Sequence, residues 1–138
     1  MYKKKIFFVL TIFAVLALAL SVFGCSVVEN AQEFYASGDE FLTALKDGDY
    51  AGAYALFHTS LQQEVGSAEN LKAMVEDNQA QPSEWSYTSF NLSTDEDGIQ
   101  TATVEGKLIY QDGREGIVEL EMVKVDDDWQ LFSFNLTW

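Results

Sequence analysis

The sequence predicts an α+β fold in which three N-terminal helices pack on a curved, mainly antiparallel sheet of four strands. Two observations support this prediction. Apolar residues recur at helical spacing up to Pro82, and at every second position after it. Short stretches rich in glycine and aspartate then interrupt the second half of the chain, as expected between antiparallel strands. Helices that precede the strands, rather than alternate with them, are typical of α+β domains.

The first predicted helix runs from Val28 to Lys46, although the Ser37-Gly38 pair weakens its middle. Gly48 is well placed to end this helix, and Asp49 to cap a second one. Ser67 is expected to open the third. The side chains expected to face inward are Val28, Ala31, Phe34, Tyr35, Phe41, Leu42 and Leu45 in the first helix, Tyr50, Ala53, Tyr54 and Phe57 in the second, and Leu71, Met74 and Val75 in the third.

Four strands are expected, over Ser83–Ser93, Thr101–Tyr110, Gly116–Val125 and Trp129–Trp138. The first changes parity between Tyr87 and Phe90, which predicts a β-bulge. Asp-Gly at 112–113 supplies the positive φ that a hairpin turn needs. The inward side chains are predicted to include Ala102, Val104, Gly106, Leu108 and Tyr110. Val118, Leu120 and Met122 share one face of the third strand, and Phe132, Phe134, Leu136 and Trp138 share one side of the last. Trp129 and Trp138 cannot lie on the same face by parity, so one of them is expected to be exposed or at the rim. Such a sheet and its helices form a cone with an internal hollow.

The chain begins with a candidate leader. Three lysines, Lys3 to Lys5, precede the apolar run Ile6–Leu20, which a small-residue region follows. These are the parts of a secretory signal peptide. An uncleaved membrane helix is the alternative, because the 18 residues from Ile6 to Phe23 reach the lower limit for spanning a bilayer.

The single cysteine of the chain, Cys25, follows this run. Val22-Phe23-Gly24-Cys25 resembles the lipobox of bacterial lipoproteins. In that family the cysteine thiol receives diacylglycerol and the peptide is cut just before it. The resemblance implies a signal peptide over 1–24, a lipidated Cys25 with a short tether over 25–28, and a domain over 29–138. It also implies an extracytoplasmic location, with the lipid anchor holding the protein to the bacterial cell membrane.

Charge excludes one class of partner. All 22 acidic residues but only five of the eight basic ones follow Cys25, so the remainder carries a net charge of −17. A surface of this sign repels phosphate, and we therefore expect no nucleic-acid partner. One cysteine allows no internal disulfide, so the domain depends on its core for stability.

Three stretches resemble one superfamily. FLTALKDGDYAGAYALF (41–57), SAENLKAMV (67–75) and DGREGIVELEMVKVDDDWQLFSFNL (112–136) are similar to the opening helices, the third helix and the closing strands of small bacterial nuclear transport factor 2-like domains, which have a cystatin-like α+β fold. That superfamily includes ketosteroid isomerase-like and polyketide cyclase-like enzymes, small-ligand binders and interaction modules. Many relatives pair through the sheet, so the resemblance also allows a homodimer. Fold alone does not choose among these functions.

No residue pattern predicts catalysis, a cofactor or a metal site. His58 is the only histidine and has no recognisable partner nearby in the sequence. The carboxylates of the strands fall on alternate positions that are expected to face solvent, and the aspartates at 126–128 are expected to form a turn. The residues predicted to line the hollow, if it is open, are Tyr54, His58, Trp85, Tyr87, Tyr110 and Trp129.

We therefore expect a non-catalytic domain that binds a small apolar ligand or an envelope protein. The alternatives are a small-molecule enzyme of the isomerase or cyclase type and a structural accessory of an envelope complex. The three differ in their interiors. An enzyme needs a carboxylate or His58 buried in the hollow, and a ligand binder needs an open apolar cavity. An accessory needs a filled cone and an exposed apolar patch, for which the outer face of the sheet is the candidate.

Overall fold

The computed structural model describes residues 31–138. The predicted leader, the Cys25 lipidation site and the tether lie outside the described residues. One compact unit spans Phe34–Trp138. Within the described part of the chain, no helix is both long and apolar enough to cross a bilayer.

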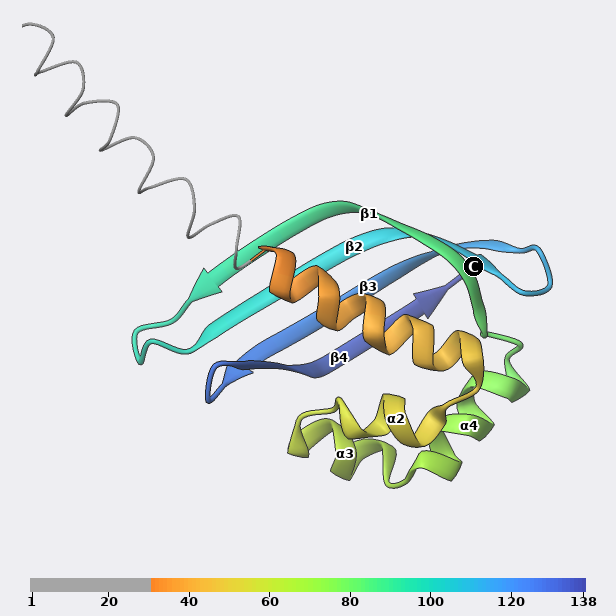
Figure 1. Ribbon diagram of the computed structural model, residues 1–138, viewed down its shortest axis with the longest axis horizontal. Coiled ribbons are helices and arrows are strands. Elements are labelled where there is room, and N and C mark those ends of the chain that lie inside the picture. The colour runs from red at the N-terminus through yellow and green to blue at the C-terminus, as the bar shows by residue number, and fades with distance from the viewer. Residues whose placement is uncertain (1–30) are drawn as a thin grey trace, which may run out of the picture. The chain divides into compact units, whose positions relative to one another are not determined.

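Helices precede strands, as predicted, and the α+β class is confirmed. Residues 31–47 are helical and are called the long helix here. It is followed by α2 (Tyr50–Ala55), α3 (Thr59–Val65), α4 (Ala68–Asp77), β1 (Pro82–Thr94), β2 (Gln100–Tyr110), β3 (Glu115–Val125) and β4 (Asp128–Thr137). The four strands form one antiparallel meander in the order β1-β2-β3-β4 (Figure 1).

The ends of the helices follow the predicted signals. Gly48 ends the long helix with a φ of 74°, and the Asp49 carboxylate accepts a hydrogen bond from the backbone N–H of Gly52 at 3.0 Å. Ser67 caps α4 in the same manner, at 3.1 Å from the backbone nitrogen of Asn70. α4 buries Leu71 and Val75 but leaves Met74 exposed, so the prediction for Met74 is wrong. The buried stripe of α4 is a single i, i+4 row, narrower than the predicted face.

Helix α3 was not among the three predicted helices. It begins after His58, whose Nδ1 accepts a hydrogen bond from the backbone N–H of Ser60 at 3.2 Å. Its buried side chains are Leu61 and Val65. Two apolar residues one turn apart are too few to establish a helical period in the sequence, which is why the helix was missed.

The long helix continues through Gly38 because the surrounding packing holds it. A Cβ at this position would lie 2.7 Å from the Tyr87 hydroxyl oxygen on β1. Glycine therefore lets the helix and the strand approach closely. Its low helix propensity, which led us to expect a weak point here, opposes the helix at this position. Phe34, Phe41 and Leu42 on the same helix are fully buried and provide the compensating contacts.

The strands confirm one predicted irregularity and add another. A register shift falls between Tyr87 and Ser89, where the bulge was expected. A second shift pairs Glu121 with Ser133 but Met122 with Leu131. Phe132 is the extra residue in this bulge and is 43% exposed, whereas Phe134 packs on Phe41 in the core, so the prediction that the two share one side of the strand is wrong. The bulge moves Leu131 into the core and changes the parity of β4.

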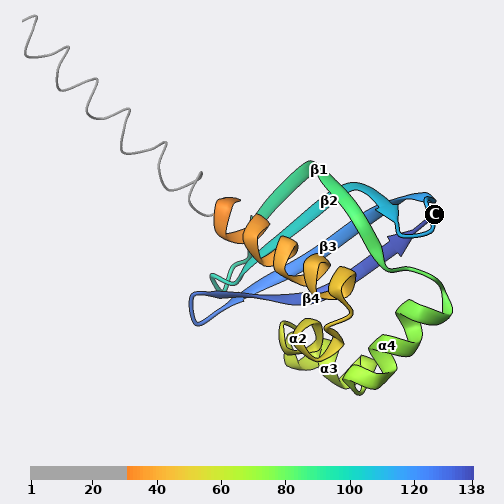
Figure 2. The same cartoon turned by 45° about the vertical axis from the view of Figure 1, so that its right-hand side comes forward.

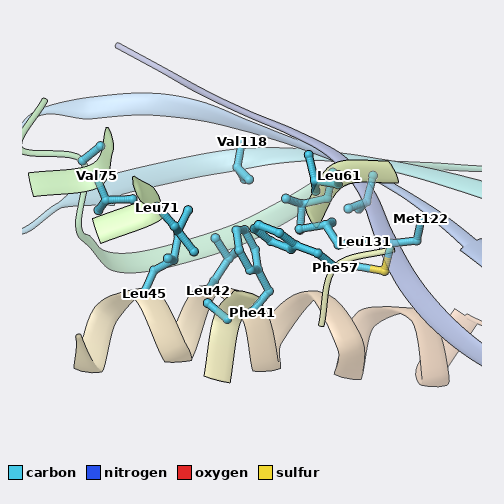
Figure 3. Close-up of a cluster of buried hydrophobic side chains, with 14 of the residues drawn as sticks. Phe41, Leu42, Leu45, Phe57, Leu61, Leu71, Val75, Val118, Met122 and Leu131 are labelled. Carbon is cyan, nitrogen blue, oxygen red and sulfur yellow. The ribbon is translucent and has the colours of Figure 1, made fainter. Parts of the chain in front are cut away.

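The core lies between the sheet and the helices. All labelled helices are on the same side of the sheet (Figures 1 and 2). In the close-up, Phe57, which follows α2, and side chains from the long helix, α3 and α4 meet side chains from β3 and β4 in one apolar layer (Figure 3). The inward positions of β2 are buried as predicted, from Ala102 to Tyr110.

Candidate functional site

Aromatic rings occupy the interior of the cone. Phe41 of the long helix contacts Phe57 and Phe134, with ring centroids 5.8 and 5.3 Å away. Nearer the start of that helix, Phe34 contacts Phe90 of β1 at 5.3 Å and Trp129 of β4 at 5.6 Å. Contacts of this length are normal for packed aromatic pairs. These rings therefore bridge the helix and the sheet directly, and they fill the space where the superfamily resemblance predicts a hollow.

Four of the predicted lining residues make local structural contacts. Tyr54 donates a hydrogen bond from its hydroxyl to the Gln62 carbonyl at 2.9 Å, which ties α2 to α3. His58 caps α3 and is partly exposed, with its ring near Phe132. Tyr110 is buried and donates to the Thr137 carbonyl at 3.0 Å. Trp129 is buried among the core rings. The structure does not bring these four side chains together around a common space.

The other two, Trp85 and Tyr87, converge on one carboxylate. The indole nitrogen of Trp85 and the hydroxyl of Tyr87 both donate to Oδ1 of Asp39, at 2.7 and 2.9 Å. Burial raises the pKa of the Tyr87 hydroxyl well above its usual range, and the hydrogen bond to Asp39 adds to the rise. Tyr87 therefore stays protonated and acts as a donor. The arrangement clamps β1 to the long helix.

Asp39 was missing from the sequence-based candidates. It lies 46 and 48 residues before its two donors, so no local spacing links them. Tyr35, one helical turn earlier, adds a second contact between the same elements, because its ring stacks on Tyr87 at 5.1 Å.

An open groove lies on the opposite side of the sheet. We define the outer face as the side away from the helices, with the side chains that alternate with the buried positions of β2 and β3. The groove there has a volume of about 710 Å³ and is lined by Glu84, Trp85, Ser86, Lys107, Leu108, Ile109, Glu115, Gly116, Ile117, Thr137 and Trp138. Of the predicted lining residues, only Trp85 borders this groove, and its indole faces the long helix, where it donates to Asp39.

The groove carries exposed apolar side chains. Ile109, Ile117 and Trp138 are 38, 58 and 59% exposed, and all three belong to its lining. Lys107 pairs with Ile117 across the strands, and Ile109 pairs with Glu115. Large apolar side chains gathered in this way on a surface are typical of interaction sites.

Arg114 holds one end of this groove in place. Its guanidinium carbon lies 4.5 Å from the centroid of the Trp138 ring, a cation–π distance. The same group donates to the carbonyls of Asn78 and Gln79 and pairs with Asp112. The backbone N–H of Arg114 donates to Asp112 at 3.0 Å and is the main reason that the pKa of Asp112 lies below its usual range. Trp138 is thus positioned although it is exposed.

Acidic residues dominate the charge of the outer face, the groove lining included. Glutamates occupy five positions there: Glu84, Glu105, Glu115, Glu119 and Glu121. Lys107 is the one basic residue among the outward positions of β2 and β3. Glu105 and Glu119 are direct cross-strand partners. In the described residues, no group of three metal-ligating side chains is positioned to hold an ion.

This architecture, a curved antiparallel sheet wrapped over a long helix, is nuclear transport factor 2-like. The chain aligns with Aln2 from a Streptomyces species at a TM-score of 0.53 and 14% identity, over 79% of this chain and 90% of that one. It aligns with ActVI-ORFA from Streptomyces coelicolor at 0.52 and 21% identity, over 78% and 95%. At these identities the likeness concerns the fold.

Residues 28–137 match the model of a family described as a domain of unknown function, DUF4864. The chain therefore belongs to that family. No protein of curated function matches it.

Proposed function

We propose that this protein is an extracytoplasmic lipoprotein whose domain binds another protein through the outer face of its sheet, as an accessory of an envelope complex. One observation carries the proposal. The interior of the cone is packed with aromatic rings, while an apolar groove of about 710 Å³ lies open on the opposite face. A filled cone with an exposed apolar patch is the combination expected of a structural accessory of an envelope complex.

The packing of the interior supports this choice over the two alternatives. Phe34, Phe41 and Phe57 are 0 to 3% exposed, and the buried side chains of the described chain are all hydrophobic or aromatic. An isomerase or cyclase needs an ionisable group facing a space that admits substrate. The Asp39–Tyr87 pair is the nearest approach to one, but Asp39 is exposed on the helix and its Oδ1 is occupied by two donors.

Native mass spectrometry of the full chain, extracted from its host in mild detergent, tests the filled interior. We expect the mass of the protein and its lipid anchor alone. A stoichiometric small molecule that is retained would support the ligand-binding alternative and overturn the choice made here.

The anchor is tested separately through Cys25. In the Cys25→Ala variant we expect an uncleaved precursor that incorporates no labelled palmitate, because the thiol is the acceptor of the lipid. Cys25→Ser provides a matched control with an oxygen in place of sulfur and should behave like the alanine variant. An unchanged mature mass and unchanged membrane retention in both variants would refute lipidation.

Site-specific photo-crosslinking in the host tests the interaction surface. A benzophenone amino acid is placed at Ile117 in the groove, or at Met74 on α4, which is comparably exposed at 58 against 47%. We expect a discrete heterologous adduct from position 117 and none from position 74. Equal adducts from both positions, or adducts only from position 74, would refute the outer face as the binding surface.

A further inference from the structure

We propose that the outer face recognises a basic polypeptide segment that carries apolar side chains. The inference rests on the proposed function and adds the chemistry of the partner. It follows from the groove, the charges around it and the length of the surface that they form together.

The groove supplies the apolar part of the site. Ile109, Ile117 and Trp138 belong to its lining, and Arg114 holds Trp138 beside Tyr110. A partner side chain that covers Ile109 and Ile117, beside Trp138 at the end of the sheet, removes apolar surface from water on both molecules. An aliphatic or aromatic anchor therefore fits the groove.

The glutamates of the outer face favour a positively charged partner. Five carboxylates and one ammonium group on this face leave an excess of four negative charges. Glu105 and Glu119 are directly opposite on adjacent strands, where like charges oppose folding. A lysine or arginine brought between them would relieve this repulsion, whereas an anionic group would increase it.

The length of the surface favours a polypeptide. From Glu115 to Glu121 along β3 is six residues, or roughly 20 Å at the usual strand rise of about 3.3 Å. Ile117 lies between Glu115 and Glu119 in this row, and Glu121 follows at the same two-residue spacing. A small molecule that fills the groove would not reach Glu121, whereas an extended or helical segment would cover the whole row.

A second copy of the chain fits poorly. In a two-fold dimer the same surface meets itself, so the acidic rows of both copies would face one another. Their mutual repulsion would oppose the contact between the two apolar grooves. Charge complementarity therefore favours a basic partner over self-association on this face.

Peptide binding to the full chain tests the inference. The protein is placed in phosphatidylcholine nanodiscs, and empty nanodiscs provide the blank. Three fluorescent ten-residue probes are compared by anisotropy: alternating Leu-Lys, alternating Leu-Glu and alternating Ser-Lys. We expect the Leu-Lys peptide to bind most tightly, and its affinity to fall with added salt because screening weakens exposed charge contacts.

Paired variants place the binding on the outer face. The double variant Glu105→Gln with Glu119→Gln is expected to lower the affinity for the Leu-Lys peptide about fivefold. This factor corresponds to the loss of two exposed charge contacts. Glu64→Gln with Glu69→Gln makes the same change in net charge on α3 and α4 and should have little effect. Ile117→Ser should weaken binding, whereas Ile99→Ser, at a residue 46% exposed outside the groove, should not.

Equal binding of the Leu-Lys and Leu-Glu peptides, or an equal loss in the control pair, would overturn the inference. So would a chain that sediments as a dimer and becomes monomeric on Ile117→Ser. If heterologous adducts at position 117 persist while the peptides are not discriminated, the chemistry of the partner is wrong and the proposed function stands. If position 117 gives no adducts, the proposed function itself fails.

Discussion

The opposed pair Glu105 and Glu119 leads to a prediction about stability. Replacing Glu119 by lysine converts a like-charge cross-strand pair into an opposite-charge pair. Each kind of pair changes the free energy of unfolding by roughly 0.2–1 kcal/mol in its own direction. The Glu119→Lys change should therefore raise the free energy of unfolding by about 0.4–2 kcal/mol. Solvent screening of these exposed side chains brings the expected increase to about 1 kcal/mol.

Thermal unfolding in low salt measures this effect. For a domain of this size, 1 kcal/mol corresponds to a rise in Tm of roughly 4 °C or more. The rise should shrink in about 1 M salt, where the Debye length is about 3 Å. Glu121→Lys is the matched control, because Glu121 faces Thr103 and Ser133 rather than a carboxylate. It should raise Tm by clearly less.

Two results would refute this reasoning. One is a Glu119→Lys protein that is no more stable than the wild type in low salt. The other is an equal gain in the Glu121→Lys control, which would mean that net charge rather than the local pair sets the effect. The same Glu119→Lys variant should bind the Leu-Lys peptide less tightly, so stability and binding should move in opposite directions.

Two further predictions concern the core and the clamp. Phe41→Ala should lower the free energy of unfolding in urea by about 3–5 kcal/mol, because the residue is fully buried, while Met74→Ala should change it by less than about 0.5 kcal/mol; similar losses in both would contradict the packing described. Tyr87 has a folded pKa above its unfolded value, so its contribution is fully present below about pH 10 and is lost as the pH rises further. Tyr87→Phe should therefore make the stability less steeply dependent on pH above 10, and an unchanged slope would contradict the raised pKa.

Much of the fold could be predicted because it depends on local signals. Asp49 and Ser67 cap helices through side chains that reach three residues along the chain. The alternation from Ala102 to Tyr110 follows from burial of one face of a strand. The parity change after Tyr87 was visible as a break in that period. These features need no knowledge of distant contacts.

The errors arose where the sequence carried no local signal. Phe132 continues the alternation of β4 in the sequence, but the bulge opposite Met122 turns it outward. Asp39 receives hydrogen bonds from Trp85 and Tyr87 across the fold, and the sequence does not connect them.

The sequence by itself determined the α+β class, the alternation of buried and exposed side chains along β2, and the acidity of the domain. These follow from periodicity and charge, which are properties of the chain. Only the tertiary structure decided whether the cone is open or filled. That outcome depends on how the rings of separate elements pack together: Phe34, Phe41, Phe57 and Trp129. The volume left between them is set by these tertiary contacts and not by any local pattern. The groove beside Trp138 was decided in the same way, by strand register and by the Arg114 contact that holds the Trp138 ring.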